Sequence, residues 1–350
     1  MKKYTIKDIA EIANVSIATV SNVINKKYNK VSQKNIDKIN AIIEELEYSP
    51  NLYAKSLISN QSRLITVLFY SEGEQFNFSD PFVGELLEGI EKIAKNTDYY
   101  IVLHNISTVD ELEILKKSSN YAGHIAVGFS DSLINQIIDY VDEPIVFVDS
   151  YLTKETQNRL ENERIYWVNS ADYDLSKQVT QLIIDRNIKQ IAFLSYEFDP
   201  NLPSVIERRW EGAKDAISIH RDILLDRYTI NQIELLIGKI EQYQAIIVTA
   251  DLLAMQLLAG IRQTQRNPKG NLSSTNQQSE VMVARLNLPD IFSFDNISYI
   301  QYIENSINTI DLYQKEKGEL ALSILVGVLQ ENLPKGNFFT NKATLIINKD

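Results

Sequence analysis

The sequence predicts an α/β protein in which a small helical head precedes a larger core of two lobes. Two observations predict this fold class. Residues 5–25 contain two short amphipathic segments joined by a tight turn, and from residue 64 onward apolar runs alternate with amphipathic helical segments. Such alternation is typical of βαβ units, whose parallel sheets carry helices on both faces. At 350 residues the chain is also too long for one ordinary core.

The stretch TIKDIAEIANVSIATVSNVIN, residues 5–25, has the pattern of a helix-turn-helix. Thr5 and Ser16 stand where the two helices would begin, because a hydroxyl accepts hydrogen bonds from a first helical turn. Asn14 tolerates the left-handed backbone of a sharp turn. A capped corner of a larger helical domain would give the same pattern. In a DNA-binding unit, the second helix would instead enter a major groove.

A third helix is expected after Ser32, since isoleucines recur there at helical spacing. The next stretch, SPNLYAKSL, predicts a short helix that begins near Asn51 and is too short to be stable alone. A plain linker is the alternative. The expected domains are a helix-turn-helix head at 1–48, a hinge helix and linker at 49–63, and a core for effector binding and dimerisation at 64–350.

The core is expected to form two doubly wound parallel-sheet lobes, with a ligand at the carboxyl ends of strands that face a shared cleft. Its N-lobe is predicted from residues 64–152 and 290–325, and its C-lobe from 153–289 and 326–350. Strands are expected at 64–70, 99–105, 124–129, 144–150, 164–170, 190–195, 245–250 and 290–296, with a terminal strand and a short extended crossing at 306–310. Helices are expected near 82–96, 109–117, 131–140, 173–186, 204–217, 229–241, 252–261 and 315–330. The polar run 263–279 predicts a loop.

Composition is that of a globular protein, with 44% hydrophobic and 23% charged residues. The net charge of −11 is unevenly divided: residues 1–63 hold ten Lys/Arg against six Asp/Glu, or +4, which leaves −15 for the rest. A basic head on an acidic body favours one docking orientation on a phosphate backbone. With no cysteine, no disulfide framework or thiolate metal site is expected, and no cofactor or metal is predicted. No apolar run reaches about 18 residues, so we expect a cytoplasmic protein.

Over essentially its full length the sequence resembles the lac repressor and galactose repressor (LacI/GalR) family. The resemblance rests on residues 5–25, on IEELEYSPNLYAKSL, and more loosely on DPF, KQIAFLS, RWEG, TADLLAM and FDN in the core. It implies a transcription regulator, usually a repressor of a carbohydrate-utilisation operon. Such a regulator is a homodimer that binds double-stranded operator DNA and has a core like a periplasmic sugar-binding protein. A small sugar-like effector bound between the lobes switches its operator affinity.

The resemblance also implies DNA-binding residues. In the head they are Thr5, Ser16, Ile17, Ala18, Thr19, Ser21, Asn22 and Asn25. In the hinge they are Asn51, Ala54 and Leu57. The hinge leucine would act as an apolar wedge inserted between base steps from the minor groove. Where the family usually has arginine this chain has Asn22. Because arginine reads guanine and asparagine suits adenine, we expect an operator base pair there that is not G·C or is only weakly read.

For the effector, the resemblance implies an arginine and carboxylates that grip hydroxyl groups, together with aromatic rings that pack on the ligand. The residues implied are Tyr70, Phe82, Asp149, Arg209, Tyr228, Asp251 and Asp295. An aspartate at a strand end is also often a helix cap, and a single arginine is often one half of an ion pair. Two departures from the family, Ala250 for an asparagine and Leu312 for a polar residue, predict a pocket with fewer hydroxyl contacts than a hexose site.

Two rival functions remain open at this point. The first is a hydrolase-like enzyme on an α/β scaffold with an attached DNA-binding head. Its support is weak, because the three histidines show no triad or metal spacing and no glycine-rich phosphate loop follows a strand. The second is a transport binding protein, which the helical head argues against. We therefore expect a regulator and not an enzyme.

Overall fold

The computed structural model describes residues 4–24, 26–46, 48, 62–70, 78–108, 110–111, 121–160, 164–266, 288–303 and 307–347. The chain divides into two compact units, residues 1–63 and 64–350. Several predicted features lie outside the described residues: Asn25, the hinge residues Asn51, Ala54 and Leu57, nearly all of the helix at 109–117, and most of the polar run 263–279. Within the described part, no helix is long and apolar enough to cross a membrane.

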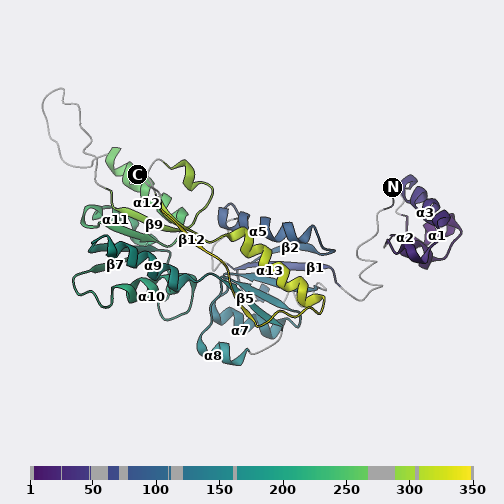
Figure 1. The fold of residues 1–350 in the computed structure, drawn as a ribbon, viewed down its shortest axis with the longest axis horizontal. Helices are drawn as coiled ribbons and strands as arrows, with labels where there is room; N and C mark the ends of the chain where they lie inside the picture. Colours follow the sequence, from purple (N-terminus) through teal and green to yellow (C-terminus); the bar gives the residue numbers. More distant parts are fainter. Residues whose placement is uncertain are drawn as a thin grey trace, which may run out of the picture. The chain divides into compact units, whose positions relative to one another are not determined.

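The first unit contains a bundle of three helices (Figure 1). They are α1 (Ile6–Ala13), α2 (Ile17–Ile24) and α3 (Gln33–Glu45), with the short 3₁₀ turn η1 (Tyr28–Lys30) before α3. Each helix turns small or β-branched apolar residues inward, and Ile9, Val20 and Ile39 are fully buried where the three meet. Lys38 of α3 donates to the carbonyl of Ala13 over 2.7 Å. This bond satisfies a backbone acceptor that the end of α1 would otherwise leave unpaired.

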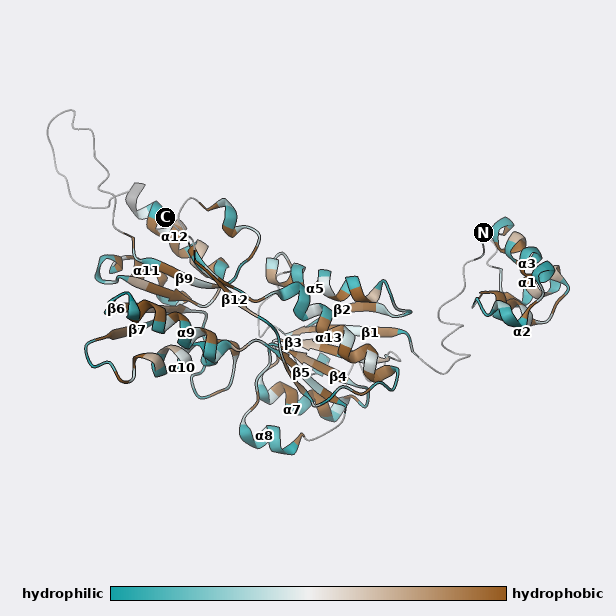
Figure 2. Ribbon diagram, in the orientation of Figure 1, coloured by the Kyte–Doolittle hydropathy of each residue, from teal (hydrophilic) through white to brown (hydrophobic). Residues whose placement is uncertain are grey.

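The second unit contains two six-stranded sheets, each with helices on both faces, and the mainly apolar strands lie inside each lobe (Figures 1 and 2). The N-lobe sheet has the order β11 (Phe338–Thr340), β5 (Ile165–Asn169), β4 (Ile145–Val148), β3 (Gly123–Val127), β1 (Leu64–Tyr70), β2 (Tyr100–Ile106). The C-lobe sheet has the order β12 (Thr344–Ile346), β10 (Ile307–Asp311), β9 (Asp290–Asp295), β8 (Ala245–Val248), β6 (Gln190–Ser195), β7 (Leu224–Thr229). All pairings are parallel except that of β12 with β10.

The helices of each lobe pack in pairs on the two faces of its sheet. In the N-lobe they are α5 (Pro81–Ala94) with α13 (Gln314–Leu329), and α7 (Asp131–Tyr140) with the short α8 (Lys154–Arg159). In the C-lobe they are α9 (Asp172–Asp185) with α10 (Val205–Ile217), and α11 (Ile233–Ile237) with α12 (Asp251–Arg266). Single 3₁₀ turns complete the C-lobe: η2 (Ile230–Gln232), η3 (Ile240–Gln242) and η4 (Ile300–Tyr302).

Glycines allow the closest helix packing. A Cβ added at Gly89 of α5 would lie 1.8 Å from the carbonyl oxygen of Lys315 in α13, and one at Gly318 would lie 2.2 Å from that of Leu86. In the C-lobe, a Cβ on Gly212 of α10 would lie 2.2 Å from the Tyr173 carbonyl oxygen of α9. Both lobes therefore use glycine to bring two helix backbones into contact.

The predicted lobe boundaries were wrong in several places, and β11, which lies in the range 326–350 assigned to the C-lobe, also joins the N-lobe sheet. Strand β5, assigned to the C-lobe, pairs with β4 in the N-lobe sheet, whereas β9 and β10, assigned to the N-lobe, belong to the C-lobe sheet. The final helix α13 packs on α5 in the N-lobe through its whole length, beyond the predicted break at residue 325. The run 306–310, expected as a crossing, forms most of β10. The chain thus passes between lobes after β5, after β10 and after β11.

Two smaller predictions were also wrong. The helix expected at 229–241 is preceded by strand β7, and only a short α11 with 3₁₀ turns follows it. The edge strand β11 was not predicted at all. Its stretch is short, and Phe338 is 54% exposed, so it lacks the continuous apolar run that marks a buried strand.

Candidate functional site

The head presents the surface expected of a recognition helix. Thr5 caps α1 in a capping box with Asp8, and Asn14 adopts a left-handed backbone with φ of 52° between the two helices. Ser16 begins α2, where its Oγ accepts a hydrogen bond from the Thr19 amide over 3.1 Å. These contacts confirm the predicted cap and turn chemistry.

The predicted DNA-facing residues of α2 lie on its outer side. Ser16, Ile17 and Ala18 are exposed, while Thr19, Ser21 and Asn22 are half-buried at the edges of the helix. Ile17 leaves 48% of its surface exposed, although a β-branched apolar side chain gains nothing from water. An uncovered isoleucine at the start of this helix is consistent with an apolar contact to a thymine methyl group.

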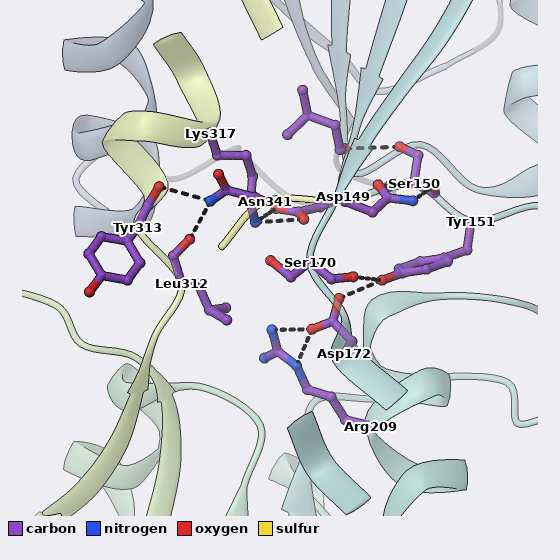
Figure 3. A network of polar contacts seen from close by, with 12 residues as sticks. Asp149, Ser150, Tyr151, Ser170, Asp172, Arg209, Leu312, Tyr313, Lys317 and Asn341 are labelled. Atoms are coloured by element: carbon purple, nitrogen blue, oxygen red, sulfur yellow. Dashed lines mark hydrogen bonds and ion pairs between the residues drawn. The ribbon is translucent and has the colours of Figure 1, made fainter. Parts of the chain in front are cut away.

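In the core, Arg209 lies at the carboxyl edge of the C-lobe sheet, and an ion pair holds it there (Figure 3). Its Nε and Nη2 donate to Oδ1 of Asp172 over 2.8 and 2.7 Å, and its Nη1 donates to the Thr249 carbonyl. The guanidinium also stacks on Phe294, 4.1 Å from the ring centre. Arg209 is only 5% exposed and Asp172 only 1%. The arginine is therefore fixed in orientation, and two of its five N–H groups bond to none of the described residues.

Asp149 is paired in the same way with a lysine from α13 (Figure 3). Lys317 Nζ donates to the two oxygens of Asp149 over 2.8 and 2.9 Å, and Lys317 is almost completely buried. Burial raises the pKa of Asp149, while the charge of Lys317 opposes that shift. Asp149 has a left-handed backbone with φ of 48°, which turns the chain sharply after β4. Sequence reasoning missed Lys317 because a lysine on a helix normally points to solvent.

Asp295 ends β9, where Arg209 and Lys317 lie within electrostatic reach. Burial raises its pKa well above the usual range for aspartate, while these two cations lower it. Asp80, the N-cap of α5, also has a pKa raised by burial. Tyr196 lies near both carboxyl groups, and burial together with their charges raises its pKa to about 12. Asp80 and Tyr196 therefore join the site from opposite lobes, and neither was predicted.

Two buried hydroxyls lie on the Arg209 face of the C-lobe sheet. Ser195 ends β6 and Thr249 follows the neighbouring strand β8, with exposures of 0% and 2%. Phe193 and Ile247, each two residues before one of these hydroxyls, pack on the side of α9 and α10. Side chains two residues apart along a strand share a face, so both hydroxyls lie on that side as well. Among the described residues, neither hydroxyl oxygen has a hydrogen-bond partner. Buried polar groups without partners are costly, so these are available for an incoming ligand.

Two predicted effector residues are placed elsewhere. Tyr228 is 6% exposed in the core between the sheet and α11, where its hydroxyl lies 2.6 Å from that of Tyr243. Asp251 is fully buried at the start of α12 and accepts bonds from Ser293, Thr309 (2.8 Å) and the Ile297 amide (2.9 Å). Its oxygens fasten α12 to β9 and β10. The polar atoms of both residues are thus engaged within the C-lobe, which disfavours either as an effector contact.

Tyr70 and Phe82, the two predicted wall residues, are half-buried in the N-lobe. Tyr70 ends β1 and packs beside Phe129, with ring centres 5.9 Å apart. Phe82 is the second residue of α5, where its amide donates to Asp80 over 3.0 Å. Both lie at the carboxyl edge of their sheet, which keeps them as candidates. In the part of the chain that the structure describes, no group of three His, Asp or Glu side chains could hold a metal ion.

Comparisons of this chain with known proteins identify its family. Residues 5–51 match the family described as bacterial regulatory proteins, lacI family. The chain is 24% identical to an HTH-type transcriptional repressor PurR of Vibrio parahaemolyticus, over 98% of this chain and 97% of that protein. It is 30% identical to a ribose operon repressor of Halalkalibacterium halodurans, over 61% of this chain and 59% of that protein.

The chain belongs to the LacI family of bacterial regulatory proteins. Among solved structures, a Lac repressor bound to ONPG in the repressed state superposes with a TM-score of 0.76 at 18% identity, over 99% of this chain and 98% of that one. The resemblance found in the sequence is thus confirmed, as is the fold class of a helix-turn-helix head with two α/β lobes. This LacI-family protein is a DNA-binding transcriptional regulator.

Proposed function

We propose that this LacI-family protein is a homodimeric repressor that binds double-stranded operator DNA through its head. In this proposal, α2 enters the major groove with Ser16, Ile17 and Ala18 foremost. The paired hinge helices insert Leu57 from the minor groove, next to the small Ala54. As a regulator of transcription it would act in the cytoplasm. The relatives are named as regulators and not as enzymes, which supports this proposal over the hydrolase alternative.

We further propose that the effector is an uncharged, hydroxyl-rich molecule such as a sugar, bound where the carboxyl edges of the two sheets meet. One observation carries this proposal: Arg209, Asp295 and the unpartnered hydroxyls of Ser195 and Thr249 converge on one edge of the C-lobe sheet. A carboxylate accepts hydrogen bonds from ligand hydroxyls, and an arginine and serine or threonine hydroxyls donate to their oxygens.

The charges around this edge disfavour an anionic effector. Arg209 is already neutralised by Asp172, and Lys317 by Asp149, both in buried ion pairs. Asp80 and Asp295 would face a ligand's phosphate or carboxylate without a cation left over from these pairs. A phosphorylated sugar would therefore lose more by desolvation and repulsion than its phosphate could gain. The ribose operon repressor among the relatives is consistent with a sugar-responsive regulator.

A thermal-shift screen with matched pairs tests the effector class. Free pentoses, hexoses and disaccharides are compared with their own phosphate esters and with nucleosides. We expect an unphosphorylated sugar to raise the melting temperature and its phosphate ester to have no effect. The conservative variant Asp295→Asn should reduce the shift. Stabilisation by the phosphate ester alone would overturn the charge argument. The sign of the effector's effect on operator affinity then separates an inducer from a co-repressor.

Selection of binding sites from random DNA tests the regulator itself and the role of Asn22. We expect palindromic sites in which the base pair under Asn22 is not G·C, and we expect Asn22→Arg to select guanine there. Recovery of guanine by the wild-type protein would contradict the assignment of Asn22. Failure to enrich any site would contradict the function as a DNA-binding regulator.

A further inference from the structure

Tyr151 is anchored in the N-lobe but contacts the C-lobe. It follows β4, and its neighbours on both sides are held by N-lobe groups: Ser150 Oγ donates to the Val148 carbonyl over 3.0 Å, and the Thr153 amide donates to Asp131 over 2.8 Å. Leu152 packs against the apolar cluster beneath α7. The backbone at residue 151 therefore moves with the N-lobe.

The side chain of Tyr151 reaches the first residue of the C-lobe helix α9 (Figure 3). Its hydroxyl lies 2.6 Å from Oδ2 of Asp172 and 2.8 Å from the carbonyl oxygen of Ser170. The other oxygen of Asp172, Oδ1, holds Arg209. The guanidinium of Arg208, the preceding residue of α10, lies over the Tyr151 ring at 5.6 Å from its centre. Two consecutive arginines of the C-lobe thus lie beside the contact between Tyr151 and Asp172.

This contact lies at the first of the chain crossings that join the lobes, because Ser170 and Asp172 directly follow β5. Those crossings are tied together by Asn341, which donates through its side chain to the carbonyls of Leu312 (2.7 Å) and Tyr313 (3.1 Å), and through its amide to that of Asn169 (2.8 Å). These bonds join the crossing segments to one another. The Tyr151 hydroxyl joins the segment after β4 to the side chain at the start of α9, so a rotation of α9 against the N-lobe would change its distance to Asp172.

We propose that Tyr151 is a positioning residue that couples the relative orientation of the two lobes to the Asp172–Arg209 pair. With the Tyr151 hydroxyl in place, both carboxylate oxygens of Asp172 accept hydrogen bonds. The Arg209 guanidinium then keeps its orientation at the carboxyl edge of the C-lobe sheet. When the lobes rotate and the Tyr151 hydroxyl moves away, Oδ2 of Asp172 loses its hydrogen-bond donor. This loss costs free energy because Asp172 is buried. This cost favours the relative lobe orientation that the structure shows. A ligand that contacts Arg209 then acts on that orientation through Asp172. The inference rests on the proposed effector site.

Distance measurements between the lobes test this coupling without knowledge of the ligand. The chain has no cysteine, so Ser132→Cys on α7 and Gln178→Cys on α9, both exposed, provide the only two spin labels in the full-length protein. Double electron–electron resonance then gives the interlobe distance distribution, with labelled chains diluted into unlabelled ones so that distances within one chain are measured.

The matched comparison is between two tyrosines that lose the same hydroxyl. Tyr151→Phe removes the interlobe bond to Asp172. Tyr243→Phe removes a bond of 2.7 Å to Asp226 that lies wholly within the C-lobe. We expect Tyr151→Phe to shift or broaden the distribution beyond its wild-type width and to change operator affinity several-fold. Tyr243→Phe should reproduce the wild-type distribution. A wild-type distribution for Tyr151→Phe, or equal broadening in both variants, would overturn the proposal.

A second variant covers the case in which Tyr151→Phe does not fold. Arg208→Gln removes the guanidinium from above the ring at a side chain that is 40% exposed, and we expect a smaller change in the same direction. No change in that variant would then count against the coupling. Failure of the regulator function itself shows up separately, as the absence of operator binding by the wild-type protein, and leaves the distance result interpretable.

Discussion

Single residues in the core act mainly through burial of charge. Arg209 and Asp172 are the clearest case, since each is nearly inaccessible and each depends on the other for a counter-charge. Removing one member of a buried pair leaves an uncompensated charge in a medium that solvates it poorly. The same chemistry that orients the arginine for a ligand therefore makes its partner important for stability.

Asp172→Ala is expected to destabilise the core by about 3–5 kcal/mol, because the buried Arg209 guanidinium loses its carboxylate. Urea unfolding followed by tryptophan fluorescence measures the change, since Trp167 reports on the N-lobe and Trp210 on the C-lobe. The control is Asp222→Ala, which removes an exposed pair with Lys189 and should leave the unfolding midpoint unchanged. Equal losses in the two variants would contradict the argument.

Asp251 gives a pH dependence whose sign follows from its pKa. Burial raises the pKa of Asp251 to about 6, above the value of about 4 in an unfolded chain. The folded state therefore binds the proton first as the pH falls, and the stability from this group is present below about pH 4 and lost as the pH rises to 6. The stability of wild type relative to Asp251→Asn should fall by about 3 kcal/mol across this window and stay constant above it. A difference that increases with pH would exclude this assignment.

At the scale of elements, packed helix pairs determine where side chains of the site can lie. The close contact of α5 with α13 fixes Asp80 at the start of one helix and Lys317 inside the other. Substitutions at two glycines of α5 distinguish the effect of helix packing from that of helix propensity, because only one of the two glycines lies in the contact with α13. Gly89 faces the α13 backbone, whereas an added Cβ at Gly84 would meet nothing within 4 Å.

Gly89→Ala is expected to destabilise the protein by about 1–3 kcal/mol or more, because the new methyl group forces two backbones apart. Gly84→Ala should be neutral or stabilise by about 0.5–1 kcal/mol, because alanine loses less entropy than glycine in a helix. Thermal unfolding of both variants makes the comparison. A loss of similar size in the two would show that glycine is not required by the contact.

The elements also show what sequence could predict. Caps and helical periodicity fixed the head, because Thr5, Asn14 and Ser16 act locally on their own helix ends. Strands of the core were located by their apolar runs, but β5, β9 and β10 look alike in sequence whichever sheet they join. Ion pairs were harder to predict than strands. Nothing in the sequence pattern of α13 separates the buried Lys317 from Lys315 two residues earlier, which pairs with Glu88 at the surface. Arg209 was predicted, but its partner Asp172 was not.

At the scale of the whole molecule, the proposed function requires the hinge to act on DNA without affecting the effector site. Leu57→Ala should leave the fold and the sugar-induced thermal shift intact while sharply weakening specific operator binding, since the apolar wedge between base steps is lost. Fluorescence anisotropy with the selected operator, together with the thermal-shift screen, measures both properties on one preparation. An unchanged operator affinity would refute the wedge, and a lost thermal shift would show that the substitution acts through the fold.

The three passages of the chain between the lobes have a consequence for synthesis. Each sheet takes an edge strand from the last ten described residues, β11 at Phe338–Thr340 for one lobe and β12 at Thr344–Ile346 for the other. In the N-lobe, one apolar face of the sheet is also not fully covered until α13 has been made. A nascent chain emerging from the ribosome can therefore complete its head long before either lobe, because neither sheet has all its strands until residues 338–346 have been made. A premature stop shortly before residue 338 would deprive both lobes of a strand at once.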